Sequence, residues 1–221
     1  MRLEGINKKG LIVGVPGSVA GELRSLSDSF IPDGESIGDD YHAFDLLELN
    51  GENLRPLPYR MRFARLVDLL LLSRSEWKYV HLVETAFKTR QKTELWQRLR
   101  QENREGIVFK RLDAPYVPGR PNQGGPQLKF KFVATLSAIV AKVNIQRSVE
   151  ISLFKGRSLI SCGNVTIPAN HEIPPAGAIV EVRYLYAYRD SVALYQPVYL
   201  GLRTDVDTDE CNVSQLKFKA E

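Results

Sequence analysis

Two short stretches of the sequence combine a carboxylate and ammonium groups at spacings that suit work on phosphate groups. Glu105 begins E-G-I-V-F-K, which ends at Lys110, and Q-L-K-F-K-F places Lys129 and Lys131 two residues apart. In an extended strand, side chains two residues apart share a face, so both ammonium groups are expected on one side and the phenylalanine rings on the other, in the core. Such a face suits phosphate binding, although an amphipathic surface strand has the same pattern.

A third stretch places a charge where a buried strand is expected. Asp45 follows Phe44 inside the apolar run of H-A-F-D-L-L, and an isolated buried carboxylate is costly unless it is paired or binds a cation. Shortly before it, I-P-D-G-E-S contains an Asp-Gly dipeptide typical of hairpin turns, followed by Glu35. The sequence therefore predicts a partner for Asp45 but does not identify it.

The elements that position these residues differ between two parts of the chain. Up to about Val133, the patterns predict helices over residues 59–73 and 89–104 and strands over 78–87 and 105–112. From Ala134 onward the pattern alternates with period two, with Gly, Pro and Asn between the runs. A first part of mixed helices and strands is thus followed by a small all-β barrel or sandwich, and the Pro/Gly-rich residues 113–127 are expected to form a loop.

Composition limits the class of protein. The 221 residues are 43% hydrophobic, and 30 Lys and Arg against 26 Asp and Glu give a net charge of +4, which only mildly favours a polyanionic partner. The two cysteines and three histidines show no metal-ligand spacing, so neither a zinc site nor a disulfide scaffold is supported. The richest apolar run, residues 66–73, is too short and too charged to cross a bilayer. These features predict a soluble, intracellular protein of the cytoplasm without membrane contact.

Taken in order, the motifs resemble those of the ATP-dependent polynucleotide ligases, a branch of the covalent nucleotidyltransferases. The order is N-K-K-G, D-G-E, F-D-L-L-x-L-x-G, E-G-I-V-F-K, K-F-K-F and finally Y-L-G-L-R-T-D. The resemblance implies an α+β nucleotidyltransferase (adenylation) domain, ATP-grasp-like with antiparallel sheets and helices, over residues 1–133. An all-β OB-fold barrel is implied over residues 134–221.

The same resemblance implies an activity. An ATP-dependent DNA ligase seals nicks through lysyl-adenylate and DNA-adenylate intermediates, in DNA repair, replication or recombination. It uses ATP and Mg²⁺ or Mn²⁺, because the polyanionic triphosphate needs positive charge in the transition state. The implied partner is nicked double-stranded DNA, bound by a monomer.

The resemblance also assigns roles to single residues. Glu105 matches a metal-binding carboxylate, Glu35 matches the carboxylate near the ribose and the metal, and Phe44 matches the aromatic residue that stacks on adenine. Arg203 and Asp205 match the pair that orients the leaving pyrophosphate. The implied catalytic residues are Lys129, Lys131 and Glu105. The residues implied to bind the cofactor are Lys8, Glu35, Phe44, Lys110, Lys129, Lys131, Arg203 and Asp205.

The opening stretch M-R-L-E-G-I-N-K-K-G has two interpretations. It is either an altered K-x-D-G-x-R motif with Arg2 in the place of the nucleophilic lysine, or the lead-in to the family's second motif, with Lys8 in that motif's basic position. Arginine stays protonated at any workable pH and cannot act as the nucleophile. The spacing to D-G-E favours the second interpretation, which places the first motif upstream of Met1. We therefore expect that these 221 residues do not adenylate themselves.

Two other functions remain open. The chain is a catalytically incomplete nucleic-acid-binding module if no nucleophile accompanies it, or an RNA ligase of the same superfamily if its substrate differs. DNA is favoured over RNA because the closing motif is similar to that of DNA ligases, and capping enzymes are disfavoured by the same segment.

Overall fold

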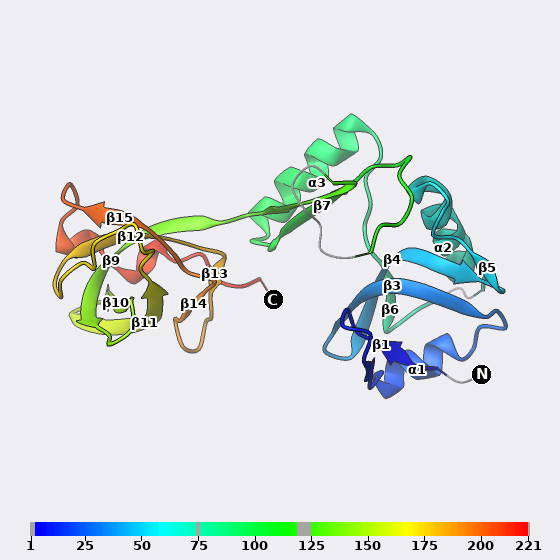
Figure 1. The fold of residues 1–221 in the computed structure, drawn as a ribbon, viewed down its shortest axis with the longest axis horizontal. Helices are drawn as coiled ribbons and strands as arrows, with labels where there is room; N and C mark the ends of the chain where they lie inside the picture. Colours follow the sequence, from blue (N-terminus) through cyan, green and yellow to red (C-terminus); the bar gives the residue numbers. More distant parts are fainter. Residues whose placement is uncertain (1–2, 74–75, 119–124, 221) are drawn as a thin grey trace. The chain divides into compact units, whose positions relative to one another are not determined.

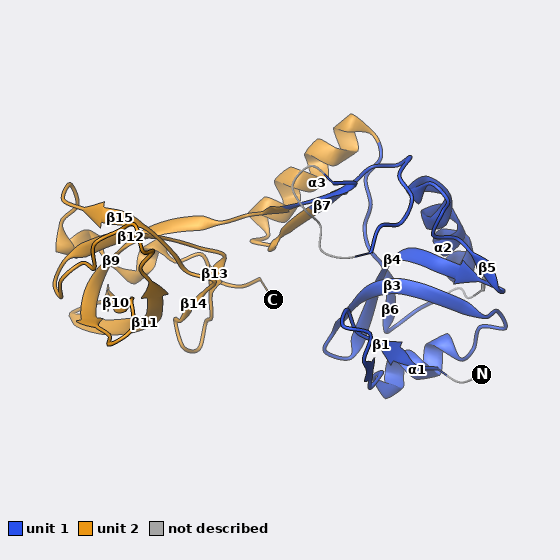
Figure 2. Ribbon diagram, viewed as in Figure 1, with its two compact units in different colours: residues 1–87, 108–129 blue, residues 88–107, 130–221 orange. Residues whose placement is uncertain are grey.

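The protein is described from a computed structural model, in which residues 3–73, 76–118 and 125–220 are described. The chain divides into two compact units (Figure 2). The first unit consists of Met1–Phe87 and Val108–Lys129, and the second of Lys88–Ile107 and Phe130–Glu221. Each unit is therefore built from two separate segments of the chain. The assignment of residues 1–133 and 134–221 to two functional domains stays a prediction.

The first unit is built on a four-stranded sheet. Its strands are β3 (Phe30–Ile37), β4 (Asp40–Leu49), β5 (Glu52–Asn53) and β6 (Val80–Leu82). Strand β4 pairs antiparallel with β3 on one side, and with β5 and, in parallel, β6 on the other. Helix α2 (Tyr59–Ser73) packs against β4 (Figure 1) and buries Leu66 and Leu70 with Leu46 of that strand. The predicted helix over 59–73 is confirmed, because its apolar residues recur at helical spacing.

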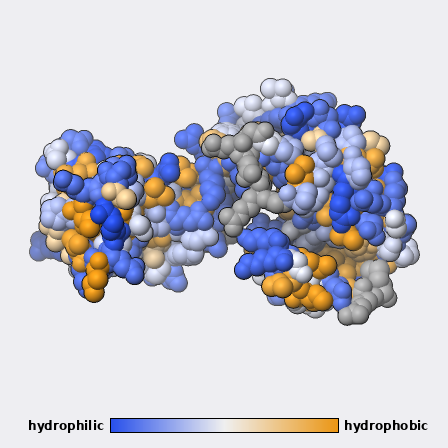
Figure 3. Space-filling view, viewed as in Figure 1, coloured by the Kyte–Doolittle hydropathy of each residue, from blue (hydrophilic) through white to orange (hydrophobic). Residues whose placement is uncertain are grey.

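A short helix is attached to this sheet through a buried carboxylate. Helix α1 (Gly17–Leu23) carries Glu22, whose carboxylate accepts the backbone N–H groups of Lys78, Tyr79 and Val80 at 2.8–3.0 Å. The N-terminal ribbon of β1 (Gly5–Ile6) and β2 (Ile12–Val13) precedes this helix in the chain. This ribbon exposes apolar side chains, visible as hydrophobic groups near β1 in Figure 3.

The Asp33-Gly34 dipeptide does not form a hairpin turn, so that interpretation is wrong. Both residues lie inside β3, where the register with β4 shifts between them. A Cβ on Gly34 would lie only 2.5 Å from the ring of Tyr41, so the close approach of that ring requires glycine. The turn lies further on, where Gly38 adopts a φ of 59°.

The second unit contains a five-stranded antiparallel sheet in the order β11-β10-β9-β12-β15. Its strands are β9 (Ala134–Val143), β10 (Ser148–Lys155), β11 (Ser158–Thr166), β12 (Ile179–Tyr184) and β15 (Val198–Arg203). Strands β13 (Tyr186–Ala187) and β14 (Leu194–Tyr195) form a separate pair, and the 3-10 turns η1 (Thr208–Glu210) and η2 (Val213–Gln215) follow β15. The predicted change to an all-β pattern at Ala134 is confirmed by these strands.

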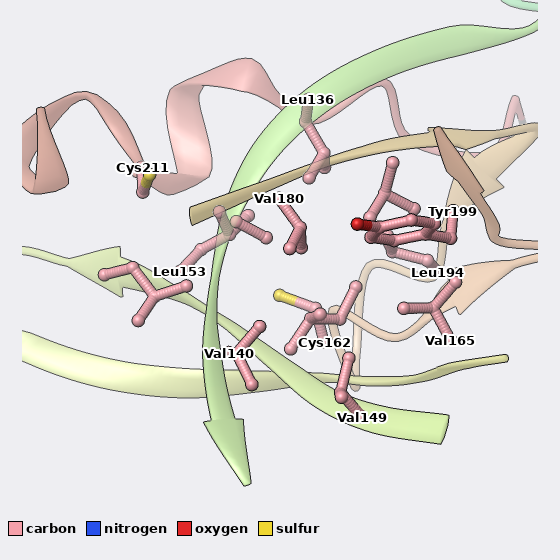
Figure 4. Close-up of a cluster of buried hydrophobic side chains, with 14 of the residues drawn as sticks. Leu136, Val140, Val149, Leu153, Cys162, Val165, Val180, Leu194, Tyr199 and Cys211 are labelled. Carbon is pink, nitrogen blue, oxygen red and sulfur yellow. The ribbon is translucent and has the colours of Figure 1, made fainter. Parts of the chain in front are cut away.

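The core of the second unit lies against this sheet. Figure 4 shows Cys162 among Val140, Val149 and Val165, together with Tyr199. Both cysteines of the chain are buried and unpaired, and burial raises the pKa of the Cys162 thiol to about 11. Cys162 therefore acts as a small apolar core residue rather than a reactive thiol.

Helix α3 (Thr89–Gln101) is followed by the strand pair β7 (Gly106–Lys110) and β8 (Gln127–Lys131), which carries three of the nine predicted site residues, Lys110, Lys129 and Lys131. Trp96 of α3 packs on the rings of Phe130 and Phe132, with centroids 4.6 and 5.0 Å away. The prediction of a strand over 78–87 was too long, because only Val80–Leu82 pairs with β4. The described part of the 113–127 loop contains no helix or strand before Gln127, and residues 119–124 lie outside the described residues.

The described residues form a sheet-rich structure with few helices, as expected for an α+β part followed by an all-β part. Within them, no helix is long and apolar enough to cross a membrane.

The two leucines Leu66 and Leu72 of α2 provide a matched test of this packing. Leu66 is fully buried and Leu72 is 83% exposed. We expect Leu66→Ala to lower the free energy of unfolding by about 2–5 kcal/mol, because it leaves a cavity. Leu72→Ala should change it by less than about 0.5 kcal/mol. Urea unfolding of both variants measures the difference, and equal effects would contradict the packing of α2 on β4.

Candidate functional site

The most buried charges of the first unit are Asp45 and Arg62. Arg62 Nε and Nη2 donate to Asp45 Oδ1 and Oδ2 at 2.8 and 2.9 Å, and both side chains are almost completely buried. The remaining Nη1 of Arg62 donates to the carbonyl oxygens of Leu57 and Ala114 at 2.5 and 3.3 Å. The predicted partner of the Asp45 carboxylate is therefore an arginine that forms a bidentate pair with it.

Lys110 adds a second cation to this carboxylate. Its Nζ lies 3.7 Å from Asp45 Oδ2, donates to the carbonyl oxygen of Phe44 at 3.4 Å, and is only 10% exposed. The ammonium also lies 4.3 and 4.5 Å from the ring centroids of Phe44 and Tyr59. Burial lowers the pKa of Lys110, and the negative charges of Asp45 and Asp33 oppose that shift.

A second carboxylate borders the cluster. Burial raises the pKa of Asp33, opposed first by the charge of Lys110 and further by a hydrogen bond from the side chain of Tyr116. The space bounded by Tyr59, Arg62 and Lys110 together with residues of the 111–127 segment is about 10 Å³. This is about the room that one water molecule needs.

Phe44 and Lys110, two of the predicted site residues, are thus brought together. One face of the Phe44 ring is occupied by the Lys110 ammonium. Stacking on a base therefore requires the other face of the ring or a movement of Lys110. Sequence reasoning did not assign Tyr59, Arg62 or Tyr116 to this cluster. The cost of burying Asp45 was the signal that a cation had to be present.

Strand β8 carries the two predicted phosphate-binding lysines. Lys129 and Lys131 are both exposed, as the alternation predicts, and Lys131 Nζ donates to Gln196 Oε1 at 2.7 Å. The expectation for the rings holds for Phe132, which is buried, but Phe130 is 46% exposed even though it contacts Trp96. The basic face of this strand is therefore accessible to an anion.

Glu105 lies just before β7 with an exposed side chain. Its carbonyl oxygen accepts the N–H of Phe132 at 2.9 Å. A Cβ on the following Gly106 would collide with the carbonyl oxygen of Phe130, so glycine is required for this close pairing. The E-G dipeptide thus places the Glu105 carboxylate at the end of the strand pair that carries the lysines.

Arg203 and Asp205 form an ion pair with each other at the end of β15. Arg203 Nε and Nη2 donate to the two carboxylate oxygens of Asp205 at 2.7 and 2.8 Å. The hydrogen bonds from Arg203 lower the pKa of Asp205. In the state described, the guanidinium edge that would face an anion is occupied by Asp205.

The remaining predicted residues lie in the first unit. Glu35 is exposed on β3 opposite His42 of β4, and Lys8 is exposed in the turn between β1 and β2. Of the predicted residues, Lys8, Glu35, Phe44, Lys110 and Lys129 belong to the first unit, and Glu105, Lys131, Arg203 and Asp205 to the second. The residues are therefore distributed over the two compact units.

Glu105 and Glu35 are the carboxylates predicted to bind a metal ion. No group of three His, Cys, Asp or Glu side chains that could hold a metal ion occurs in the described part of the chain. Mg²⁺ is commonly bound by one or two carboxylates together with substrate phosphates, so a lone exposed carboxylate such as Glu35 or Glu105 fits that mode of binding. It does not fit a metal site made by the protein alone.

Comparison with known proteins gives a consistent family. Residues 28–131 match the family described as ATP dependent DNA ligase domain. The chain is 33% identical over 117 residues to a probable DNA ligase of Dictyoglomus turgidum, a match that covers 52% of this chain and 18% of that protein. It is 35% identical over 100 residues to a DNA ligase of Methanopyrus kandleri, covering 45% and 17%. The chain thus spans less than a fifth of the length of these relatives.

A solved structure named Pmar-Lig_Pre has a similar fold. The TM-score is 0.64 at 16% sequence identity, and the match covers 88% of this chain and 57% of that one. The similarity extends over most of the chain and concerns the fold alone.

Removal of Arg62 tests the buried ion pair. We expect Arg62→Met to lower the free energy of unfolding by about 3–5 kcal/mol, because it leaves Asp45 buried with only the more distant Lys110. The double variant Arg62→Met with Asp45→Leu should lose clearly less, since the fully buried carboxylate is removed and the Lys110 ammonium, which is 10% exposed, keeps the charge of Asp33 nearby. Urea unfolding measures both variants, and a double variant less stable than the single one would contradict this account.

The position of Lys110 predicts a pH dependence of stability. The pKa of Lys110 is below 10.5 in the folded protein. Between that lowered pKa and 10.5, Lys110 is therefore protonated more often in the unfolded chain than in the folded protein. The contribution of Lys110 to the free energy of unfolding should therefore increase with pH in that window, by at most about 1.4 kcal/mol per pH unit. Lys110→Met should lack this increase in urea titrations at successive pH values. An identical pH profile in the variant would contradict the burial of the ammonium.

Proposed function

Because residues 28–131 match the family described as ATP dependent DNA ligase domain, we propose that this chain is the nick-sealing part of an ATP-dependent DNA ligase. One observation carries the proposal: the matched segment includes six of the nine predicted site residues in the order of the family's motifs. These are Glu35, Phe44, Glu105, Lys110, Lys129 and Lys131. Lys8, Arg203 and Asp205 lie outside the segment.

The sealing step defines what the residues must do. At a nick whose 5′-phosphate carries an adenylate, the 3′-hydroxyl oxygen attacks the phosphorus atom. A phosphate ester forms, the bond from phosphorus to the bridging oxygen of AMP breaks, AMP leaves with the electron pair, and the hydroxyl proton passes to solvent. Negative charge on the phosphate oxygens must be offset during this step. The exposed ammonium groups of Lys129 and Lys131 are suited to that role.

The cofactors follow from the same assignment. ATP is the proposed donor of the adenylate, with Phe44 at the adenine and Lys8 and Lys110 among its cationic contacts. Arg203 and Asp205 are proposed to orient the pyrophosphate, which requires that their ion pair opens. Mg²⁺ or Mn²⁺ held by Glu105 and Glu35 together with substrate phosphates would neutralise charge on the phosphate oxygens.

The second unit is proposed to be an OB-fold domain. Its five-stranded antiparallel sheet and its small apolar core support this assignment. The substrate is proposed to be nicked double-stranded DNA, in repair, replication or recombination, and the names of the curated relatives support DNA over RNA. We propose that the protein acts as an intracellular monomer.

Sealing of a nick that already carries a 5′-adenylate tests the proposal, because this step needs no nucleophilic lysine. With Mg²⁺, the chain should join such a nick in duplex DNA. Lys129→Met with Lys131→Met should slow the joining by about 100-fold or more, as expected when charge stabilisation of a transition state is lost. The matched control is Lys155→Met, because Lys155 is an exposed lysine at the end of β10. Gel separation of joined and unjoined strands gives the rates.

The outcomes separate the candidate functions. Binding of the nick without joining, under conditions in which a complete ligase joins it, would contradict the proposal and favour a nucleic-acid-binding module. Faster joining of an adenylated RNA nick than of the DNA nick would favour an RNA ligase.

A further inference from the structure

The pentapeptide Q-L-K-F-K occurs twice in the chain. The first copy, Gln127–Lys131, is strand β8, and the second, Gln215–Lys219, lies near the end of the sequence. We call the second copy the C-terminal QLKFK segment. Since the first copy carries the predicted phosphate-binding lysines, the second supplies the same pair of ammonium groups at another place.

The C-terminal QLKFK segment is held on the second unit by backbone and side-chain contacts. The N–H of Ala187 donates to the carbonyl oxygen of Lys217 at 2.8 Å, and the N–H of Lys219 donates to the carbonyl oxygen of Ala187 at 3.0 Å. Tyr184 Oη accepts the N–H of Lys217 at 2.8 Å. The segment is therefore positioned along β13 rather than being a loose end.

The two lysines of the segment have different environments. Lys217 is half-buried, and its Nζ donates to the carbonyl oxygen of Phe132 at 2.5 Å. Burial lowers its pKa, opposed by the charge of Glu105. Lys219 is exposed, with its Nζ 5.7 Å from the ring centroid of Tyr186. Lys217 is thus an internal contact, whereas the ammonium of Lys219 is accessible.

A hollow of about 350 Å³ opens between this segment and the end of α3. Its lining consists of Glu102, Asn103, Arg104, Arg189, Phe218, Lys219 and Ala220, all in the second unit. The guanidinium carbon of Arg189 lies 5.4 Å from the ring centroid of Phe218, so the guanidinium packs over the phenylalanine ring. A volume of this size admits a phosphate group with its sugar.

The charges of the hollow favour an anion. Among the described residues that line the hollow, three are cations, Arg104, Arg189 and Lys219, and one is a carboxylate, Glu102. That carboxylate already accepts hydrogen bonds from Arg98 and Arg104 at 3.2 Å. The carbonyl end of α3 adds partial negative charge, but basic Arg98 and Arg100 in the last turn offset it. Guanidinium groups bind phosphate through two parallel hydrogen bonds, and an ammonium adds a point charge.

We propose that this hollow is a second phosphate-binding site, separate from β8, in which Arg189 and Lys219 hold a backbone phosphodiester of the nucleic acid. Only the identification of the bound polymer as nucleic acid rests on the proposed function. The site binds the backbone without reading sequence and holds the nucleic acid on the second unit.

Salt-dependent binding of the full 221-residue chain to a fluorescently labelled nicked duplex tests the site. Arg189→Gln with Lys219→Gln should weaken binding about fivefold or more near 0.1 M salt. It should also reduce the slope of log K against log salt by about one to two, since each phosphate contact contributes about 0.9. The matched control is Lys155→Gln with Arg157→Gln, which removes an exposed lysine at the end of β10 and an exposed arginine from the turn after it, in the same unit. The control should leave the slope unchanged.

The outcomes are decisive in both directions. Equal slopes for the protein and the Arg189/Lys219 variant, or equal losses in both double variants, would overturn the proposal. If the double variant shows a lowered thermal midpoint, Lys219→Gln alone decides, because that side chain is exposed and its loss should still reduce the slope by about one. Joining of adenylated nicks is measured separately. Binding that depends on Arg189 and Lys219 without joining would preserve this site and remove the proposed function.

Discussion

The buried pair of Asp45 and Arg62 is the constraint on which the first unit depends. Asp45 lies in the central strand of the sheet, so its carboxylate must be satisfied inside the core. Arg62 does this from α2 and also binds the carbonyl oxygens of Leu57 and Ala114. One guanidinium therefore joins the sheet, the helix and the segment after β7. Lys110 forms an ion pair with the same carboxylate and lies over the ring of Phe44. Two predicted nucleotide-binding residues are therefore held in place by the charges that also stabilise the core.

Sequence patterns predicted those elements whose faces are set by local spacing. The helix over 59–73 was correct because its apolar residues recur at helical spacing, and the strands after Ala134 followed from alternation. The cost of burying Asp45 predicted a partner, but the pairing spans 17 residues and two elements, so the pattern could not identify Arg62. The Asp-Gly dipeptide was misinterpreted because the ring of Tyr41, a tertiary contact, sets the requirement for glycine at Gly34.

The order of motifs predicted the similarity to ATP-dependent DNA ligases but not the geometry of the site. The resemblance assigned Phe44 and Lys110 as separate contacts of a nucleotide, whereas the structure places the ammonium of one on the ring of the other. The two copies of Q-L-K-F-K show the same limit. Gln127–Lys131 is a strand, but Gln215 ends a 3-10 turn and Phe218 makes a single bridge to Ala187. Five identical residues thus adopt different structures because their neighbours differ.

The carboxylate of Glu22 has a consequence for the order of folding. Helix α1 has seven residues, and helices of that length are not stable alone in water. Its anchor consists of the N–H groups of Lys78, Tyr79 and Val80, which are 56 to 58 residues away in the chain. Closing so long a loop is slow, and β6 must already lie beside β4 before these groups are in place. Helix α1 should therefore form late in folding, after α2 and the sheet.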